Sequence, residues 1–164
     1  MNQGHDLSHI TYEGSGNHAS TQVVIAVSKW NTQITEALFQ GALRVLEEAG
    51  IPASQIIRWD VPGTYELPTA AKMAMVNRPN IDGVICLGCV IQGETRHFDF
   101  ICQAAAQGIM QVSLDHAKPV IFGVLTPDTD QQALDRAGGK YGNKGEEAAV
   151  AFLDMVDVHR MAKS

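Results

Sequence analysis

The chain has 164 residues, of which 45% are hydrophobic, and its formal net charge is -6. A chain of this length can bury about two thirds of the surface that its unfolded form exposes, so one domain with a single core is expected. No apolar run approaches the roughly 18 residues of a membrane span, and a negative chain without a lysine and arginine run offers no general attraction to nucleic acid. We therefore expect a cytoplasmic protein that binds neither membranes nor nucleic acid.

Residues 1–20 are polar and rich in glycine, serine and histidine, apart from a short patch at His9 to Tyr12. Such a composition is typical of a chain terminus that lies outside the core. We expect residues 1–20, with His18 among them, to form a flexible arm that can add a strand to a neighbouring subunit. Residues 21–164 are expected to form the single α/β domain.

Four short runs rich in β-branched residues follow from Gln22 onward. They cover residues 23–27, 56–59, 83–87 and 120–125. The runs are almost continuously apolar, which is typical of strands that are covered on both faces of a parallel sheet.

Segments with helical periodicity fill the intervals between these strands. Gly50 is a common type of helix terminator, Thr129 to Gln132 form a capping box, and Asn143 is a candidate cap for the last helix. Alternation of strands and helices predicts right-handed crossovers and an α/β fold, a three-layer sandwich with a central parallel, flavodoxin-like doubly wound sheet of four strands. The helical patterns cover residues 34–49, 67–76, 98–109, 133–137 and 148–156.

The chain has three cysteines, and two of them, Cys86 and Cys89, have the C-x-x-C spacing. A redox or zinc site would need this pair at a helix start or further ligands nearby. Cys86 instead lies within an apolar strand and Cys89 follows it, and buried cysteine behaves as a small hydrophobic residue. We favour structural cysteines over reactive ones.

Ligands of open α/β sheets bind outside the carboxyl ends of the strands. The segments that follow the four predicted strands are residues 28–31, 60–66, 89–97 and 126–128. We expect them to converge on one rim of the sheet, which makes this rim the place to search for a site.

Two residues of the first two segments are candidates for ligand contacts. Trp30 could stack on a heteroaromatic ring, although an aromatic residue at this place could equally belong to the core or to an interface. Glu66 could bind a polar ligand together with N–H groups of the turn at Gly63, although an isolated glutamate there is more often a helix N-terminal charge.

The third segment carries the strongest signal for an anion and for proton transfer. Gly93, Glu94 and Thr95 lead into a predicted helix start, where backbone N–H groups and the threonine hydroxyl can hold a phosphate. His97 follows in the first turn, and imidazole transfers protons near neutral pH, although a single histidine is more often an ordinary surface residue.

Basic side chains cluster in a glycine-rich segment between the last two predicted helices. Arg136, Lys140 and Lys144 could bind a phosphate there, and the glycine density predicts a tight helix-to-helix turn. The alternative is that each base satisfies the carbonyl groups and the dipole of a helix C-terminus, and for each residue separately we favour that interpretation.

Taken together, these segments resemble the lumazine synthase family from Val23 to the C-terminus. The resemblance implies a site that straddles two chains, in which Trp30 stacks on the pyrimidine and Phe122 comes from the adjacent subunit. The motifs that carry the resemblance are residues 61–68, 88–99, 136–138 and 142–145.

The resemblance also implies a role for each site residue, with His97 as the catalytic group that transfers protons. The phosphate of the second substrate would be held by Gly93, Glu94, Thr95, Arg136 and Lys144. The pyrimidinedione would be bound by Trp30, Asn31, Thr64, Tyr65, Glu66, Cys89, Val90, Ile91 and Phe122.

The reaction that the resemblance implies joins 5-amino-6-(D-ribitylamino)pyrimidine-2,4-dione to 3,4-dihydroxy-2-butanone 4-phosphate. It yields 6,7-dimethyl-8-ribityllumazine, phosphate and water, the penultimate step of riboflavin biosynthesis, and it needs no cofactor or metal. The family implies a homopentamer, with icosahedral assemblies of pentamers in some members, and riboflavin synthase as a partner.

Gln92 and Gly139 depart from residues that many members of the family carry, and Trp30 replaces the more common phenylalanine. These departures leave one alternative open, a catalytically inactive paralogue that forms a shell or binds a flavin. A receiver-type signalling domain shares the alternating architecture, but it would need acidic residues after its first and third strands. Lys29 to Asn31 and Cys89 to Ile91 stand at those places, so we reject this alternative.

Overall fold

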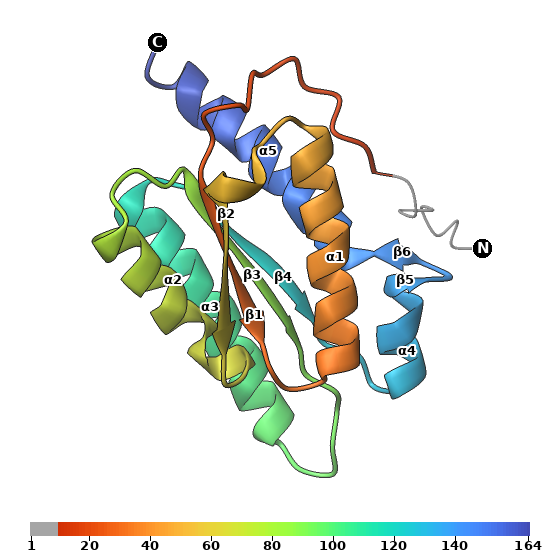
Figure 1. Cartoon of the computed structure of the whole chain (residues 1–164). Coiled ribbons are helices and arrows are strands. Elements are labelled where there is room, and N and C mark those ends of the chain that lie inside the picture. Colours follow the sequence, from red (N-terminus) through yellow and green to blue (C-terminus); the bar gives the residue numbers. More distant parts are fainter. Residues whose placement is uncertain (1–9) are drawn as a thin grey trace, which may run out of the picture.

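A computed structural model describes residues 10–164 as one α/β unit in three layers (Figure 1). Parallel strands form the central layer, in the order β2-β1-β3-β4, so the sheet is doubly wound as expected. The strands are β1 (Val23–Ser28), β2 (Ile56–Val61), β3 (Gly83–Cys89) and β4 (Val120–Leu125). The helices are α1 (Thr32–Glu48), α2 (Leu67–Asn77), α3 (His97–His116), α4 (Asp130–Asp135) and α5 (Lys144–Met161), with two short 3-10 turns, η1 (Ala53–Gln55) and η2 (Thr64–Glu66).

Alternate residues of the central strands face two separate cores. In β1, Val23, Ile25 and Val27 pack against α1 and α5, whereas Val24 and Ala26 pack against α2 and α3. Every residue of β1 and β3 is buried. The apolar runs of β1 and β3 are therefore explained by helices on both faces of a parallel sheet, as predicted. The prediction is wrong for the edge strands β2 and β4, which are only partly buried.

The first turns of α4 and α5 carry the predicted caps. Thr129 Oγ1 accepts a hydrogen bond from the Gln132 N–H (3.2 Å), and Asn143 Oδ1 accepts one from the Gly145 N–H (2.8 Å). Gly145 also permits close packing, because a Cβ atom there would lie 1.8 Å from the carbonyl oxygen of Leu38 in α1. The start of α5 is thus fixed both by its cap and by contact with α1.

The glycine-rich segment between α4 and α5 is more ordered than the simple turn that was predicted. It forms an antiparallel pair, β5 (Ala137–Gly139) and β6 (Gly142–Asn143), in which Gly138 and Gly142 have φ angles of 103° and 78°. Left-handed backbone at two positions suits glycine and lets the chain reverse within a few residues. Strands this short have no hydrophobic period, so no sequence pattern predicted the pair.

The N-terminal segment from Ile10 runs beside α5 before it enters β1 (Figure 1). Sequence reasoning placed His18 in an arm outside the core, but the structure buries its side chain to 1% exposure. The first nine residues of the expected arm lie outside the described residues, and its pairing with a neighbouring subunit stays a prediction. Among residues 10–164, no helix is long and apolar enough to cross a membrane.

Candidate active site

A cleft of about 820 Å³ opens at the carboxyl ends of β1, β2 and β3. Parallel strands place the segments that follow them at one edge of the sheet, which is why residues far apart in the sequence meet here. Nine of its lining residues are sequence-predicted site residues: Trp30, Asn31, Thr64, Tyr65, Glu66, Cys89, Val90, Ile91 and His97.

One wall of the cleft combines an aromatic ring with a carboxylate. Trp30 is 73% exposed, so its ring is not a core residue in the described chain. A Cβ atom on Gly63 would lie 3.0 Å from Trp30 Cδ1 and 3.2 Å from Glu66 Oε2. The absence of a side chain at Gly63 therefore lets the indole and the carboxylate approach the same stretch of backbone.

Asn31 joins the segment after β1 to the last residue of β3. Its backbone is left-handed, with φ 59° and ψ 50°, and its carbonyl oxygen accepts hydrogen bonds from Ile34 and Thr35 at the start of α1. Its Nδ2 donates to the carbonyl oxygen of Cys89 (3.0 Å). Asparagine tolerates this conformation better than most residues, and the side chain then fixes the backbone of the opposite wall.

The opposite wall is extended backbone that continues beyond β3. The Val90 N–H donates to the carbonyl oxygen of Leu125 (2.9 Å), and the Gln92 N–H donates to that of Pro127 (2.9 Å). These bonds hold Val90 and Ile91 in line with β3 at the mouth of the cleft. Hydrogen bonds along a chain of this kind restrict its backbone motion.

Beyond Gln92 the chain becomes exposed and then enters α3. Gly93, Glu94 and Thr95 form this exposed loop, and Thr95 Oγ1 accepts a hydrogen bond from the His97 N–H (3.4 Å) at the helix start. His97 is the first residue of α3, is exposed, and lines the cleft. The predicted proton-transfer residue and the helix start therefore lie at the same mouth.

Two lining residues, Phe100 and Ile101, were not predicted, and Gly63 was expected only as the turn whose N–H groups face a polar ligand. Phe100 and Ile101 stand three and four residues after His97, which puts them on the same face of α3. This spacing from His97 would have allowed both residues to be predicted from the sequence. Phe100 is 67% exposed, so it adds an apolar surface next to the imidazole.

Burial governs the polar groups at the floor of the cleft. It raises the pKa of the Cys89 thiol to about 12, with Asp130 and Cys102 adding to the effect, so this thiol is protonated near neutral pH. The hydroxyl oxygens of Ser28 and Thr64 are buried and have no hydrogen-bond partner among the described residues. The protonated, buried thiol favours a structural role for Cys89 over a reactive one.

Two of the three predicted basic residues, Arg136 and Lys144 but not Lys140, line a second cleft of about 510 Å³ beside the carboxyl end of β4. Arg136 and Lys144 line it together with Tyr141, and neither lines the first cleft. Arg136 Nη1 donates to the carbonyl oxygen of Gln132 (3.2 Å), and its guanidinium lies 4.9 Å from the ring centre of Tyr141. Arg136 thus contacts a carbonyl group near the C-terminus of α4, which is the interpretation that the sequence favoured over phosphate binding for each base separately.

Phe122 also lies apart from the first cleft. It belongs to β4, which is an edge strand, pairs in register with Cys86 of β3, and is 37% exposed. One described chain thus brings together His97 and all the predicted pyrimidinedione residues except Phe122. It leaves Phe122, Arg136 and Lys144 on a different part of the surface.

This geometry defines a class of protein, a flavodoxin-like α/β protein with a small-molecule cleft at the carboxyl edge of its parallel sheet. The chain belongs to the 6,7-dimethyl-8-ribityllumazine synthase family, whose model matches residues 20–160. The resemblance that the sequence motifs predicted is therefore confirmed.

Several curated relatives are named 6,7-dimethyl-8-ribityllumazine synthase. The protein of Cytophaga hutchinsonii is 55% identical over 147 residues, which are 89% of this chain and 92% of that protein. The protein of Flavobacterium johnsoniae is 51% identical, over 84% of this chain and 72% of its own length. The protein of Porphyromonas gingivalis is 48% identical, over 96% and 97% of the two chains.

Proposed function

We propose that this chain condenses 5-amino-6-(D-ribitylamino)pyrimidine-2,4-dione with 3,4-dihydroxy-2-butanone 4-phosphate to 6,7-dimethyl-8-ribityllumazine, with release of phosphate and water. The observation that carries the proposal is the cleft in which Trp30, Glu66 and His97 meet, in a chain of the lumazine synthase family. An aromatic face, a carboxylate and an imidazole suit a flat heterocycle with a polyhydroxyl chain whose amine must exchange protons.

In this proposal the pyrimidinedione lies against Trp30, and its edge faces the backbone of Cys89 to Ile91. Glu66 and the neighbouring Thr64 and Tyr65 face the ribityl chain. The support is positional: Asn31 holds the Cys89 carbonyl, and Gly63 leaves room for the indole and the carboxylate side by side. Stacking on the indole contributes about 0.5 to 1.5 kcal/mol beyond burial.

The keto-phosphate is proposed to enter at the mouth of the same cleft, near the start of α3. The exposed loop of Gly93, Glu94 and Thr95 offers backbone groups to its phosphate, and His97 stands beside it. His97 would move protons during imine formation and ring closure. Positioned proton transfer gives typically about 10² to 10⁴-fold, whereas holding both reactants in place is worth about 7 to 11 kcal/mol, so proximity should dominate.

The phosphate needs a fixed cation, and the described chain keeps Arg136 and Lys144 in a second cleft. We propose that a neighbouring subunit supplies Arg136, Lys144 and Phe122 to the first cleft. The exposure of Phe122 on edge strand β4 supports this arrangement. A site of this kind is complete only in a homo-oligomer.

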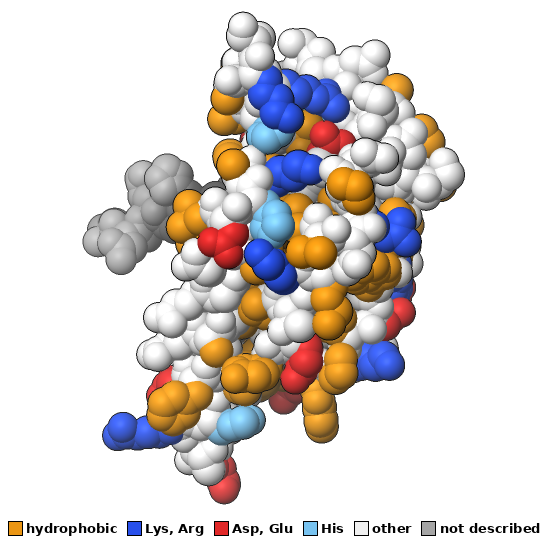
Figure 2. Space-filling model, turned by 90° about the vertical axis from the view of Figure 1, so that its left-hand side faces the viewer, with side chains coloured by type: hydrophobic (Ala, Val, Ile, Leu, Met, Phe, Trp, Pro, Cys, Tyr) orange, Lys and Arg blue, Asp and Glu red, His pale blue; other side chains and the backbone are white. Residues whose placement is uncertain are grey.

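The face formed by α2 and α3 supports an oligomer independently. It carries exposed Met73, Val76, Met110 and Leu114, and a groove of about 510 Å³ runs between the two helices. Figure 2 looks onto this side, where apolar side chains lie between charged ones. Apolar groups gathered in this way are typical of a surface that another chain covers.

We propose a homopentamer for the assembly and an icosahedral shell of pentamers as its larger form. Sedimentation velocity distinguishes the two, because a mass near five chains would reject the shell. The family resemblance also leads us to propose the cytoplasm as the location and riboflavin synthase as a partner. Co-sedimentation of the two purified proteins tests that partnership.

The activity is tested by mixing the purified protein with both substrates and following lumazine absorbance against a blank without protein. The blank is required because the two substrates also condense unaided. Acceleration that saturates in both substrates supports the proposal. A rate equal to the blank would overturn it in favour of an inactive paralogue that forms a shell or binds a flavin.

A further inference from the structure

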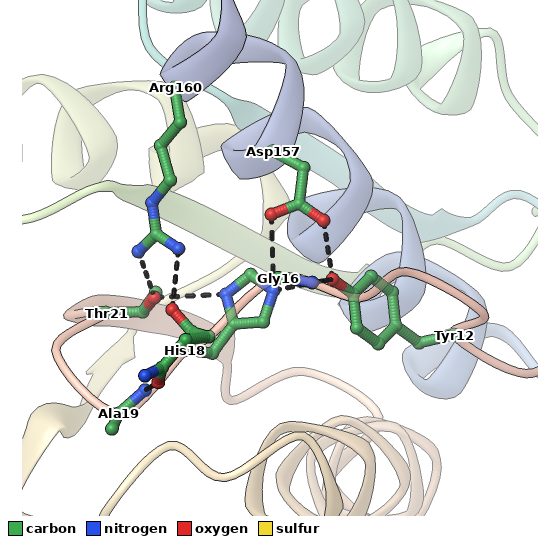
Figure 3. A network of polar contacts seen from close by, with 8 residues as sticks. Tyr12, Gly16, His18, Ala19, Thr21, Asp157 and Arg160 are labelled. Atoms are coloured by element: carbon green, nitrogen blue, oxygen red, sulfur yellow. Dashed lines mark hydrogen bonds and ion pairs between the residues drawn. The ribbon is translucent and has the colours of Figure 1, made fainter.

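A polar cluster outside both clefts ties the N-terminal segment to α5 (Figure 3). Tyr12, His18 and Thr21 come from the segment before β1, and Asp157 and Arg160 come from the last turns of α5. The His18 side chain is 1% exposed, and its ring meets the ring of Tyr12 edge to face, with centres 5.2 Å apart. A buried titratable ring between two segments is sensitive to its own protonation state.

The contacts fix the position of the imidazole proton. Tyr12 donates its hydroxyl hydrogen to Asp157 Oδ2 (2.5 Å), so the 2.8 Å contact between Tyr12 Oη and His18 Nε2 requires N–H on Nε2. At the other ring nitrogen, Nδ1 lies 3.1 Å from Thr21 Oγ1, which accepts an N–H of Arg160 (2.8 Å). Thr21 can then donate its hydroxyl hydrogen to Nδ1, and the neutral imidazole satisfies every contact.

A second proton on the imidazole breaks this arrangement. Nδ1 would become a donor facing Thr21 Oγ1. Thr21 would then accept hydrogen bonds from both Arg160 and His18, and its own hydroxyl hydrogen would lose its acceptor, Nδ1. The charge would also lie inside the protein. Burial, the largest effect, and Arg160 oppose the charge, whereas Asp157, 3.5 Å from Nε2, and Asp82 favour it.

We propose that these five residues, Tyr12, His18, Thr21, Asp157 and Arg160, form an acid-sensitive clasp. The clasp holds residues 12–21 on α5 while His18 is neutral and opens when His18 is protonated. It is not part of either cleft, so it stands independently of the proposed catalytic reaction. Opening would free the segment that leads from the N-terminus into β1, and with it any contact that this segment makes with another subunit.

The direction of the pH dependence follows from the balance of charges around His18. Burial lowers the pKa of His18 below 6.5, and Arg160 lowers it further, against the opposing effects of Asp157 and Asp82. Because the pKa is lower in the closed state than in the open state, the closed state binds fewer protons. The clasp is therefore at full strength above about pH 6.5 and weakens as the pH falls below that value.

Amide hydrogen exchange of the full chain, corrected for intrinsic rates, measures the clasp directly. The amides of Gly16 and Thr21 report on it, because they donate to Tyr12 Oη (3.3 Å) and to the His18 carbonyl oxygen (2.9 Å). Between about pH 7.5 and about pH 5.5 we expect their protection to fall by up to about tenfold, the limit that a free imidazole pKa of about 6.5 allows. Unchanged protection would overturn the proposal.

His18→Gln keeps a donor of similar reach but cannot be charged, so its protection should not change over the same pH range. His159→Gln is the matched control. His159 lies in α5, as Asp157 and Arg160 do, but takes no part in the cluster. This variant should lose protection in acid as the parent protein does. If the amides of Gly16 and Thr21 lose as much protection in acid in His18→Gln as in the parent protein, the clasp is refuted.

Two further variants test the mechanism through the pKa of His18, measured by deuterium exchange at the imidazole C2 position. Tyr12→Phe leaves Asp157 free to face His18, so the pKa should rise. Asp157→Asn removes the negative charge, so the pKa should fall. A cluster that only fills space would move neither value, and a pKa that stays fixed in both variants would reject the inference.

Discussion

Asn31 offers a sharp test of how the cleft is built, because its left-handed backbone and its side-chain hydrogen bond can be removed separately. Asn31→Ala loses the bond from Nδ2 to the Cys89 carbonyl and also leaves a Cβ-bearing residue at φ 59°. A hydrogen bond contributes about 0.5 to 1.5 kcal/mol and left-handed backbone costs about 1 to 2 kcal/mol. Asparagine already bears part of that cost, so we expect a total loss of about 2 kcal/mol.

Asn31→Gly is the matched variant, since glycine adopts the left-handed conformation freely but makes no side-chain bond. Its loss should be about 1 kcal/mol from the hydrogen bond. For a chain of this size, 1 kcal/mol corresponds to about 2 to 4 °C, so the alanine variant should melt below the glycine variant by about that interval. Calorimetry at one protein concentration and scan rate makes the comparison.

Both variants should also raise the KM for the pyrimidinedione, because both free the Cys89 carbonyl that Asn31 holds at the cleft wall. Steady-state kinetics with the keto-phosphate saturating measures this. Equal melting temperatures for the two variants would refute the argument from backbone conformation. An unchanged KM in both would refute the argument that Asn31 positions the wall.

Three further substitutions test the proposed chemistry and the packing. His97→Ala should reduce kcat by about 10² to 10⁴-fold without abolishing activity, because the two substrates are still held together. Stopped-flow absorbance against the blank measures this, and an unchanged kcat would refute the role of His97 in proton transfer. Arg136→Ala should raise the KM for the keto-phosphate by about 10 to 100-fold, as a charge-assisted bond is worth about 1.5 to 3 kcal/mol; an unaltered KM would remove Arg136 from the phosphate site. Gly145→Ala should lower the free energy of unfolding by about 1 to 3 kcal/mol or more, because its Cβ would lie 1.8 Å from a carbonyl oxygen of α1. Gly93→Ala is the control: a Cβ there meets nothing within 4 Å, so the melting temperature should not change.

Short-range signals accounted for much of the fold. The unbroken apolar run at 83–87 predicted a strand covered on both faces, and β3 has that position in the sheet. Thr129 and Asn143 predicted helix starts because a cap is a contact between residues two or three apart. The sequence could not indicate the β5 and β6 pair, because two or three glycine-rich residues have no periodicity.

The predicted rim followed from a general property of parallel sheets rather than from any single residue. Once β1, β2 and β3 were identified, Trp30, Glu66 and His97 had to lie at the same edge, and they line one cleft. Motif resemblance could not show that Arg136 lies in a different cleft of the same chain. That separation depends on the path of the chain after β4, which no local pattern encodes.

The sequence by itself determined the strand and helix order, the helix caps and the family, because these depend on neighbours along the chain or on motifs within it. Only the tertiary structure decided which distant side chains meet. His18 is the clearest case: nothing in a polar, glycine-rich segment marks it as buried. Its partner Asp157, and Arg160, which donates to the neighbouring Thr21, lie about 140 residues further along the chain. Burial and hydrogen bonding between such residues are properties of the folded molecule, since they arise only when chain closure brings the two segments together.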